Sequence, residues 1–205
     1  EGWQNQARPV WYRVDLGLID MIKKLEEMSL EELWQLFPIF LVEHKSEWKD
    51  WYELEKTSLK KILGANVIKR IEHIGSTAIP NIWAKNIIDI LLEVGRIEDL
   101  ARVRDLLVKN GWLVMSESPN RISLNKGYTE QGFAEKVFHL HLRMTGDYDE
   151  IYFRDYLCQH SDIAQAYQEL KLSLWKKFEH NRDAYTDAKT DFINHYVSEA
   201  KSSNF

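Results

Sequence analysis

The chain has 205 residues, of which 44% are hydrophobic and 29% are charged, and its net charge at pH 7 is −5. This length predicts one globular domain or one domain with an appendage, and the acidic balance argues against broad nucleic-acid binding. A lone cysteine, Cys158, excludes an intrachain disulfide, and no apolar run approaches the ~18 residues of a membrane helix, so we expect a cytoplasmic protein with no membrane partner.

Residues 1–38 are predicted to form an N-terminal helical arm. Residues 1–14 show no clear period, whereas residues 16–37 have the apolar spacing of amphipathic helices, with a capping box at Ser29 and Glu32. Four apolar residues gather near the end of this arm: Leu33, Trp34, Leu36 and Phe37. This patch predicts packing on the chain's own domain or on a second copy, so a homodimer through the N-terminal segment is one expectation.

Residues 39–205 are predicted to form the main domain, with an α/β sheet part at 39–145 and C-terminal helices at 146–205. Strands are expected at residues 39–43, 67–74, 86–94, 112–115, 121–126 and 136–143. Helices are expected at residues 46–63, 77–84 and 97–110, and again from residue 149 to about residue 200, with breaks near Ser161 and Asn181. This order predicts a mixed α/β (α+β) fold in which helices flank a mixed sheet and form a helical C-terminal layer.

The turn Gly75-Ser76-Thr77 joins a predicted strand to the start of a predicted helix. Glycine lets the backbone come close to a ligand, and the N–H groups at a helix start favour phosphate. Asp89 interrupts the next apolar strand, where its carboxylate would hold a hard cation that bridges to the phosphate. The alternative is an ordinary tight turn, with an acid that caps a neighbouring element or pairs with a lysine or arginine.

Several short motifs follow one another in a characteristic order. They are HIGSTAIP at residues 73–80, AK at 84–85, IIDI at 87–90, HLHLR at 139–143, FRDYL at 153–157 and YTDAKT at 185–190. Together they resemble the signature of the GrpB family over about residues 39–200. That family is similar to the nucleotidyltransferase superfamily, whose members have a DNA polymerase β-like fold. The resemblance implies a nucleotidyltransferase-like sheet, a nucleotide or other phosphorylated ligand, and a divalent metal.

The same resemblance implies roles for individual residues. Gly75, Ser76 and Thr77 would bind phosphate, and Asp89 would hold the metal and serve catalysis. Where the superfamily has a second acid, this chain has Leu91. Glu93 is on the same face of the predicted strand, but it is about 13 Å from Asp89, which is too far to share an ion.

His139 and His141 are two positions apart and therefore share one face of a predicted strand. We hypothesise that they stand near Asp89, as metal ligands or, for His141, as a catalytic proton carrier. Imidazole ligands would move the metal preference from Mg²⁺ towards Mn²⁺ or Zn²⁺. The alternative is that each histidine is a half-buried strand residue bonded to a backbone carbonyl.

Roles are also predicted for several basic and aromatic residues. The basic residues expected to bind the anionic ligand are Lys85, Arg121, Arg143 and Arg154. Lys171 and Lys189 occur among acids on predicted helices, and we interpret them as a solvated, salt-bridged face. The aromatic residues interpreted as packing between helices are Tyr167, Trp175, Phe178, Tyr185 and Phe192.

Two functions remain open at this point. The first is an enzyme that binds a nucleoside triphosphate with a divalent cation and moves a nucleotidyl group to an unknown acceptor. The second is a catalytically reduced module that binds a phosphorylated or CoA-related ligand or a partner, because members of the family are fused to dephospho-CoA kinase. An enzyme should surround one metal with two acids or a histidine–acid pair, whereas a module should hold Asp89 in a salt bridge.

Overall fold

A computed structural model describes residues 24–64, 66–146 and 148–203 of the chain; the predicted arm at residues 1–14 and the start of the helix predicted at 16–37 lie outside this part. The helices are α1 (Leu30–Leu36), α2 (Glu47–Leu63), α3 (Ile97–Lys109), α4 (Asp149–Gln159), α5 (Ser161–Phe178), α6 (Arg182–Asp187) and α7 (Thr190–Ser202). The strands are β1 (Leu41–Val42), β2 (Ile68–Ile74), β3 (Ala84–Lys85), β4 (Ile87–Val94), β5 (Leu113–Ser118), β6 (Arg121–Thr129) and β7 (Gly132–Met144), and two short 3₁₀ helices are η1 (Leu25–Glu27) and η2 (Ser76–Ala78). Within these ranges, no helix combines the length and the apolar character needed to cross a membrane.

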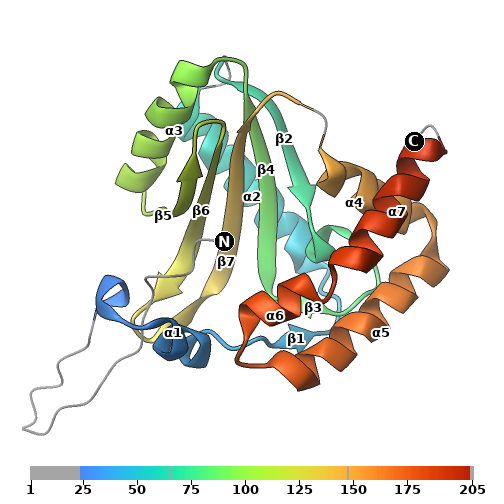
Figure 1. The fold of residues 1–205 in the computed structure, drawn as a ribbon. Helices are drawn as coiled ribbons and strands as arrows, with labels where there is room; N and C mark the ends of the chain where they lie inside the picture. The colour runs from blue at the N-terminus through green and yellow to red at the C-terminus, as the bar shows by residue number, and fades with distance from the viewer. Residues whose placement is uncertain (1–23, 65, 147, 204–205) are drawn as a thin grey trace, which may run out of the picture.

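Five strands form one mixed sheet in the order β2-β4-β7-β6-β5 (Figure 1). β4 and β7 run parallel, and the other neighbouring strands run antiparallel. The parallel register sets Asp89 opposite His139 and Leu91 opposite His141. β1 and β3 form a separate two-stranded sheet. The predicted fold class, a mixed sheet with flanking helices and a helical C-terminal layer, is confirmed.

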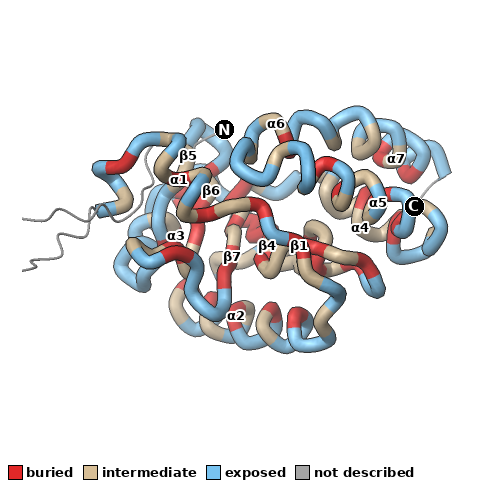
Figure 2. Tube along the Cα trace, turned by 90° about the horizontal axis from the view of Figure 1, so that it is seen from below, coloured by how far each residue is buried: buried red, intermediate tan, exposed pale blue. Residues whose placement is uncertain are grey.

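The sheet has one apolar and one polar face, because successive side chains of a strand point to opposite sides. Ile88, Ile90 and Leu92 of β4 belong to the main core, where they meet apolar residues of α2 and α3. Figure 2 shows the sheet between α2 on one side and the C-terminal helices on the other. Asp89 alternates with these apolar residues and therefore points towards the C-terminal helices.

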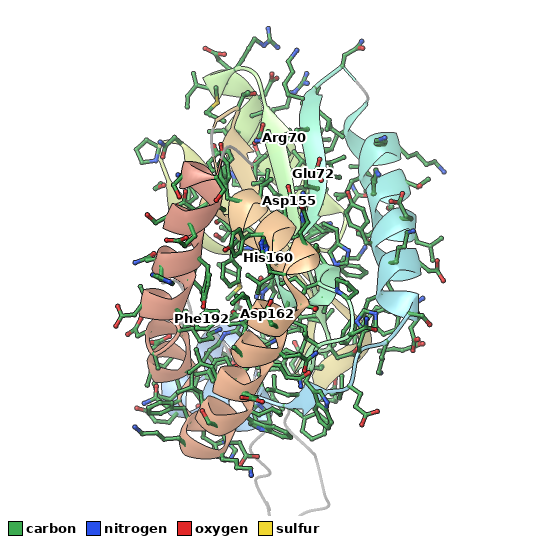
Figure 3. The ribbon with its side chains drawn as sticks, turned by 90° about the vertical axis from the view of Figure 1, so that its right-hand side faces the viewer. Arg70, Glu72, Asp155, His160, Asp162 and Phe192 are labelled. Atoms are coloured by element: carbon green, nitrogen blue, oxygen red, sulfur yellow. The ribbon has the colours of Figure 1, made fainter. Side chains whose placement is uncertain are left out.

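The C-terminal helices pack mainly on η2, on the segment after it and on one another. Their shared apolar cluster contains Ile79, Ile82, Phe153, Leu157, Ala164, Tyr167 and Val197. The ring of Phe192 on α7 stacks on Tyr167 of α5 with 5.3 Å between centroids, and Figure 3 shows Phe192 between these two helices. This cluster does not include residues of β4 or β7. The C-terminal helices therefore cover the polar face of these two strands, but their apolar side chains do not fill the space next to it.

The described part of the N-terminal arm packs on the chain's own sheet. Ser29 Oγ accepts a hydrogen bond from the Glu32 backbone at 3.2 Å, and Glu32 Oε2 accepts one from the Ser29 backbone at 2.7 Å, so the predicted capping box starts α1. Leu33 and Phe37 are buried against residues of β4, β6 and β7. Most of the predicted apolar patch is thus used within the chain.

Some predicted elements differ from the structure. The helix predicted at residues 77–84 is reduced to the single turn η2, because Pro80 follows it and Asn81 has a φ of 60°. The strands predicted at 121–126 and 136–143 extend towards each other to form a long β6–β7 hairpin. Gly127 and Gly132, with φ of 89° and 111°, accommodate the irregular backbone of that hairpin.

Candidate functional site

A cavity of about 600 Å³ lies between the polar face of the sheet and the C-terminal helices, and we call it the first cavity. Its walls come from the end of β2, from η2, β3, β4 and β7, and from the C-terminal helices. The predicted site residues that line it are Gly75, Ser76, Thr77, Lys85, Asp89, His139, His141 and Arg143. Residues far apart in the chain are thus brought together at one place.

Gly75 brings the loop after β2 into contact with Asp89. Its φ of 72° lies in a region that L side chains rarely adopt. A Cβ built on Gly75 would also stand 2.5 Å from Asp89 Oδ2. Glycine is therefore required here, because only a residue without a side chain lets the backbone before Ser76 lie against the carboxylate.

Asp89 Oδ1 is the point at which two imidazoles meet. His139 Nδ1 lies 3.3 Å from this oxygen, and His141 Nε2 lies 3.6 Å from it. Burial acts to raise the pKa of Asp89, but hydrogen bonding and charge from the two histidines outweigh burial and lower that pKa below its usual range. The carboxylate is therefore ionised at neutral pH.

The far side of His139 is held by Tyr128, whose hydroxyl oxygen lies 2.7 Å from His139 Nε2. Burial lowers the pKa of His139 to about 4, so its ring is neutral at pH 7. A neutral ring carries one N–H group. With that N–H at Nδ1, directed towards Asp89, Nε2 accepts a hydrogen bond from the Tyr128 hydroxyl, and this network assigns the Nδ1–H tautomer to His139. Two side chains, Asp89 and Tyr128, thus lie within bonding distance of the two ring nitrogens of His139.

Three lysines from different elements line the first cavity: Lys85 of β3, Lys171 of α5 and Lys189 just before α7. Lys171 is only 2% exposed, and no ion pair of these lysines is found within the described residues. The interpretation of Lys171 and Lys189 as a solvated, salt-bridged face is therefore wrong. The helical spacing explains the error for Lys171, which shares the buried stripe of α5 with Tyr167 and Leu174.

Burial and mutual repulsion lower the pKa values of these lysines. The pKa of Lys171 falls to about 7, first through burial and then through the charge of Lys189. The pKa of Lys189 falls to about 8 through burial and the charge of Arg182. The pKa of Lys85 lies well below its usual range, through burial and then the charges of Arg182 and Lys189. Such a cluster favours an anionic ligand, whose charge would restore the protonated forms.

Tyr167 and Tyr185 are buried, as predicted for packing residues, but both also line the first cavity. The Tyr185 ring lies between two ammonium groups, with its centroid 5.8 Å from Lys85 Nζ and 4.3 Å from Lys189 Nζ. The Tyr167 hydroxyl is hydrogen-bonded to the side chain of Ser76. The cavity therefore combines cations with aromatic surface.

Thr77 is used by the fold itself. Its hydroxyl donates to the carbonyl of Ile87 at 3.2 Å and lies 2.9 Å from His73 Nε2, which therefore donates to it. The ring of His73 stacks on Tyr52 of α2 with 4.8 Å between centroids. Thr77 thus fixes the loop between β2 and β3, whereas Ser76 is half-buried at the cavity wall.

The predicted arginines fall into three positions. Arg143 lines the first cavity, but its charge is paired with Glu150 at 2.6 Å. Arg154 lies outside that cavity, because it bonds Glu72 at 3.0 Å and Asp155 at 2.7 Å. Figure 3 shows Glu72 on β2 beside Asp155 on α4. Arg121 lines a neighbouring pocket.

The position of the missing second acid is apolar and closed. Leu91 is fully buried, and Glu93 is 1% exposed and accepts a hydrogen bond from Arg70 Nε at 3.0 Å. In the part of the chain that the structure describes, no three His, Cys, Asp or Glu side chains are arranged to hold a metal ion. The donor set does not fit a preformed transition-metal centre, for which three or four protein ligands are usual.

Comparison with known proteins places these features in a family. A family model described as "GrpB protein" matches residues 38–199. The Glutamate-rich protein GrpB of Alkalihalophilus pseudofirmus is 32% identical over 170 residues, which cover 78% of this chain and 95% of that protein. The UPF0157 protein YqkA of Bacillus subtilis is 32% identical over 184 residues, and the chain spans only about half (52%) of its length.

A solved structure agrees with the sequence matches. The crystal structure of conserved protein GrpB from Enterococcus faecalis superposes with a TM-score of 0.70 at 30% identity, covering 80% of this chain and 99% of that one. The matched range, residues 38–199, agrees with the range over which the sequence motifs resemble the family. The chain belongs to the GrpB family.

Proposed function

We propose that the first cavity binds a nucleoside triphosphate, or another small molecule with several phosphoryl groups. The observation that carries this proposal is the convergence of Lys85, Lys171 and Lys189 on one cavity, without an ion pair of their own within the described residues. Keeping ammonium groups away from water is costly unless a counter-charge is supplied. A polyphosphate supplies several negative charges at once.

The other residues that line the first cavity suggest how such a ligand would be oriented in it. The loop at Gly75 and Ser76 offers backbone and a hydroxyl next to Asp89, at the side where a phosphate can approach closely. Tyr148, Phe153 and Tyr185 add aromatic surface to the same cavity. A nucleobase can stack on such rings while the phosphoryl groups face the lysines.

A divalent cation would enter with the phosphoryl groups. Mg²⁺ is commonly bound by one or two carboxylates together with substrate phosphates, and Asp89 offers one carboxylate at the right place. The contacts of 3.3 and 3.6 Å from the imidazoles to Asp89 are longer than ordinary hydrogen bonds, so an ion can replace them at little cost. Mg²⁺ or Mn²⁺ is therefore the better proposal than Zn²⁺ on His139 and His141.

Nucleotidyl transfer is the reaction class implied by the resemblance of the motifs, and Asp89 and His141 are the residues we propose for it. A second candidate function is binding without turnover, of a phosphorylated or CoA-related ligand. Leu91 at the position of the second acid favours this second candidate.

Titration calorimetry tests the proposal. ATP, GTP, CTP and UTP are titrated separately with Mg²⁺ and with Mn²⁺, and at least one should bind in a metal-dependent way. Asp89→Asn should remove the metal dependence, whereas Asp50→Asn, at an exposed acid on α2, should leave it unchanged. Silence of all four nucleotides contradicts nucleotide binding, and binding without pyrophosphate release in the presence of candidate acceptors favours the second function.

A further inference from the structure

Four side chains from four different elements form a continuous series of contacts that ends at Asp89. Arg182 Nη1 on α6 donates to the Tyr128 hydroxyl on β6 at 3.3 Å, and that hydroxyl oxygen lies 2.7 Å from His139 Nε2 on β7. His139 Nδ1 in turn lies 3.3 Å from Asp89 Oδ1 on β4. We call these four residues the Arg182–Asp89 network. It runs from a positive charge at one end to a negative charge at the other.

The two ends of this network set the direction of its hydrogen bonds. A guanidinium group only donates hydrogen bonds, and an ionised carboxylate only accepts them. The Tyr128 oxygen therefore accepts from Arg182, and its O–H group donates to His139 Nε2. The neutral ring of His139 then carries its proton on Nδ1 and donates to Asp89 Oδ1. The reverse direction would leave two lone pairs facing each other, one on Nδ1 and one on the carboxylate.

This direction leaves His139 without a lone pair for a metal ion. An imidazole binds a metal through an unprotonated ring nitrogen. In the Arg182–Asp89 network, Nδ1 carries the proton, and the lone pair of Nε2 accepts from Tyr128, which is only 6% exposed. His139 therefore supports Asp89 as a neutral hydrogen-bond donor, and it is not available as a ligand while the network is intact.

The distances around Asp89 are otherwise close to those of a zinc site. With bonds of about 2.1 Å at tetrahedral angles, neighbouring ligand atoms are about 3.4 Å apart. His139 Nδ1 and His141 Nε2 lie 3.3 and 3.6 Å from Asp89 Oδ1. Even so, no three acids, histidines or cysteines among the described residues are arranged to hold an ion. The network gives a physical reason, because a proton occupies the side of the His139 ring that faces the carboxylate.

His141 is not held in the same way. Its Nδ1 is buried without a hydrogen-bond partner in the described part of the chain, and its Nε2 is farther from Asp89 than His139 Nδ1 is. No contact comparable to that of Tyr128 therefore fixes the proton of His141 on one nitrogen. This difference suits the proposed role of His141 as a proton carrier and that of His139 as a positioning residue.

We propose that Tyr128 and Arg182 determine which metal ion the first cavity accepts. By holding the proton of His139 on Nδ1, they deny the imidazoles beside Asp89 to Zn²⁺ and to other ions that prefer nitrogen ligands. Asp89 is then left as a single carboxylate, which suits Mg²⁺ or Mn²⁺ bound together with phosphoryl groups. The inference rests on the proposed function for the identity of the native ion, but the position of the proton and the exclusion of Zn²⁺ require no nucleotide.

The first test reads the tautomer of His139 by nuclear magnetic resonance in the full chain, with histidines labelled by ¹⁵N and no nucleotide present. The wild type should show a protonated Nδ1 and an unprotonated Nε2 at neutral pH. Arg182→Gln introduces an amide that can also accept, so the Nε2–H form should become populated, whereas the donor-only side chain of Arg182→Lys should preserve the wild-type signals. Tyr52→Phe is the matched control, because Tyr52 is also 6% exposed and its hydroxyl bonds the Ile71 carbonyl at 3.1 Å.

The second test titrates the same proteins with Zn²⁺. Zn²⁺ should leave the signals of His139 and His141 unchanged in the wild type. In Arg182→Gln and in Tyr128→Phe it should bind at these rings about 10–100-fold more tightly, the range over which the partners of metal-binding histidines change metal affinity. Adding Asp89→Asn to either variant should abolish the gain.

The proposal is overturned if His139 carries its proton on Nε2 in the wild type, or if neither variant gains affinity for Zn²⁺ at these rings. Because two different residues are replaced, misfolding of one variant leaves the other to decide. Failure of ATP and tripolyphosphate to bind would instead count against the proposed function, and the results for Tyr128 and Arg182 would stand.

Discussion

Gly75 lies against Asp89 so closely that a methyl group at residue 75 would stand 2.5 Å from Oδ2 of the carboxylate. The loop that carries Ser76 and the acid on the neighbouring strand are thus positioned by one contact between two residues that are fourteen positions apart. The structure of the loop and the position of the carboxylate therefore depend on each other.

Replacing Gly75 by alanine should disturb both stability and ligand binding. The positive φ and the overlap with Asp89 together should cost about 2–4 kcal/mol of unfolding free energy, which urea denaturation measures. Gly111→Ala is the matched control, because Gly111 also has a positive φ, of 86°, but has nothing within 4 Å of the added methyl group. If both variants lose the same stability, the contact with Asp89 contributes nothing beyond the backbone strain.

Replacing Lys171 by methionine should weaken tripolyphosphate binding without destabilising the fold. Methionine has a similar shape and no charge to bury, so the melting temperature should stay the same or rise, although the bond from Lys171 to the Trp83 carbonyl is lost. Tripolyphosphate affinity should fall at least about tenfold, because one ammonium–phosphate contact is removed. Calorimetry measures the affinity, and Lys176→Met on the exposed side of α5 should change neither quantity. Unchanged affinity in Lys171→Met would count against phosphate binding by the lysines.

The lowered pKa values of Lys171 and Lys189 predict that stability rises with pH between about 7 and 9. In this range the unfolded chain keeps both lysines protonated, whereas the folded chain, with pKa values of about 7 and 8, releases the protons. The unfolded state therefore binds more protons, and the unfolding free energy should increase by up to about 1.4 kcal/mol per pH unit for each lysine. Denaturation at a series of pH values should show a smaller slope in Lys171→Met than in the wild type. Equal slopes would mean that the lysine is charged in the fold.

The same lysines predict proton uptake when a polyphosphate binds. At pH 8 the ligand would raise their pKa values, so binding should take protons from the buffer and should weaken as the pH rises further. Calorimetric titrations with tripolyphosphate in two buffers of different ionisation enthalpy measure the number of protons taken up on binding. A value of zero at pH 8 would show that the ammonium groups are already charged without ligand.

The buried, neutral His73 should make the folded protein less stable in acid. Burial lowers its pKa to about 4, so between pH 6.5 and 4 the unfolded chain binds a proton that the folded chain does not, and stability falls as the pH decreases through this window. His73→Gln keeps an N–H donor for Thr77 but cannot titrate, so the slope of stability against pH should be reduced. The slope that remains is expected from His139, whose pKa is also about 4. His195→Gln, at an exposed residue of α7, should leave the slope unchanged.

Strand alternation was enough to predict where the polar residues of the sheet would lie. His139 and His141 share a face because they are two residues apart, and the motif order correctly indicated that this face meets Asp89. The parallel pairing of β4 and β7 that brings them together could not be read from either strand alone, because register depends on both partners and on the segment between them.

The helical side of the cavity was harder to predict. Lys171 follows Tyr167 by four residues within α5, so it lies on the same side of that helix as a buried ring. That spacing was a usable signal, but neighbouring acids made a solvated face the more ordinary interpretation. For Arg154, whose position follows from contacts with Glu72 and with the His73 carbonyl, no pattern in the sequence indicated the partner.

The parallel pairing of β4 with β7 also has a consequence for how the chain reaches its folded state. Some fifty residues separate Asp89 from the two histidines, and they meet only after α3 and the β5–β6 hairpin have been placed and β7 has inserted between β4 and β6. Closing so long a segment is slow compared with forming local helices, so the first cavity should be among the last features to form during synthesis and refolding. Recovery of ligand binding would then time the final step of assembly, whereas helical signal would return earlier.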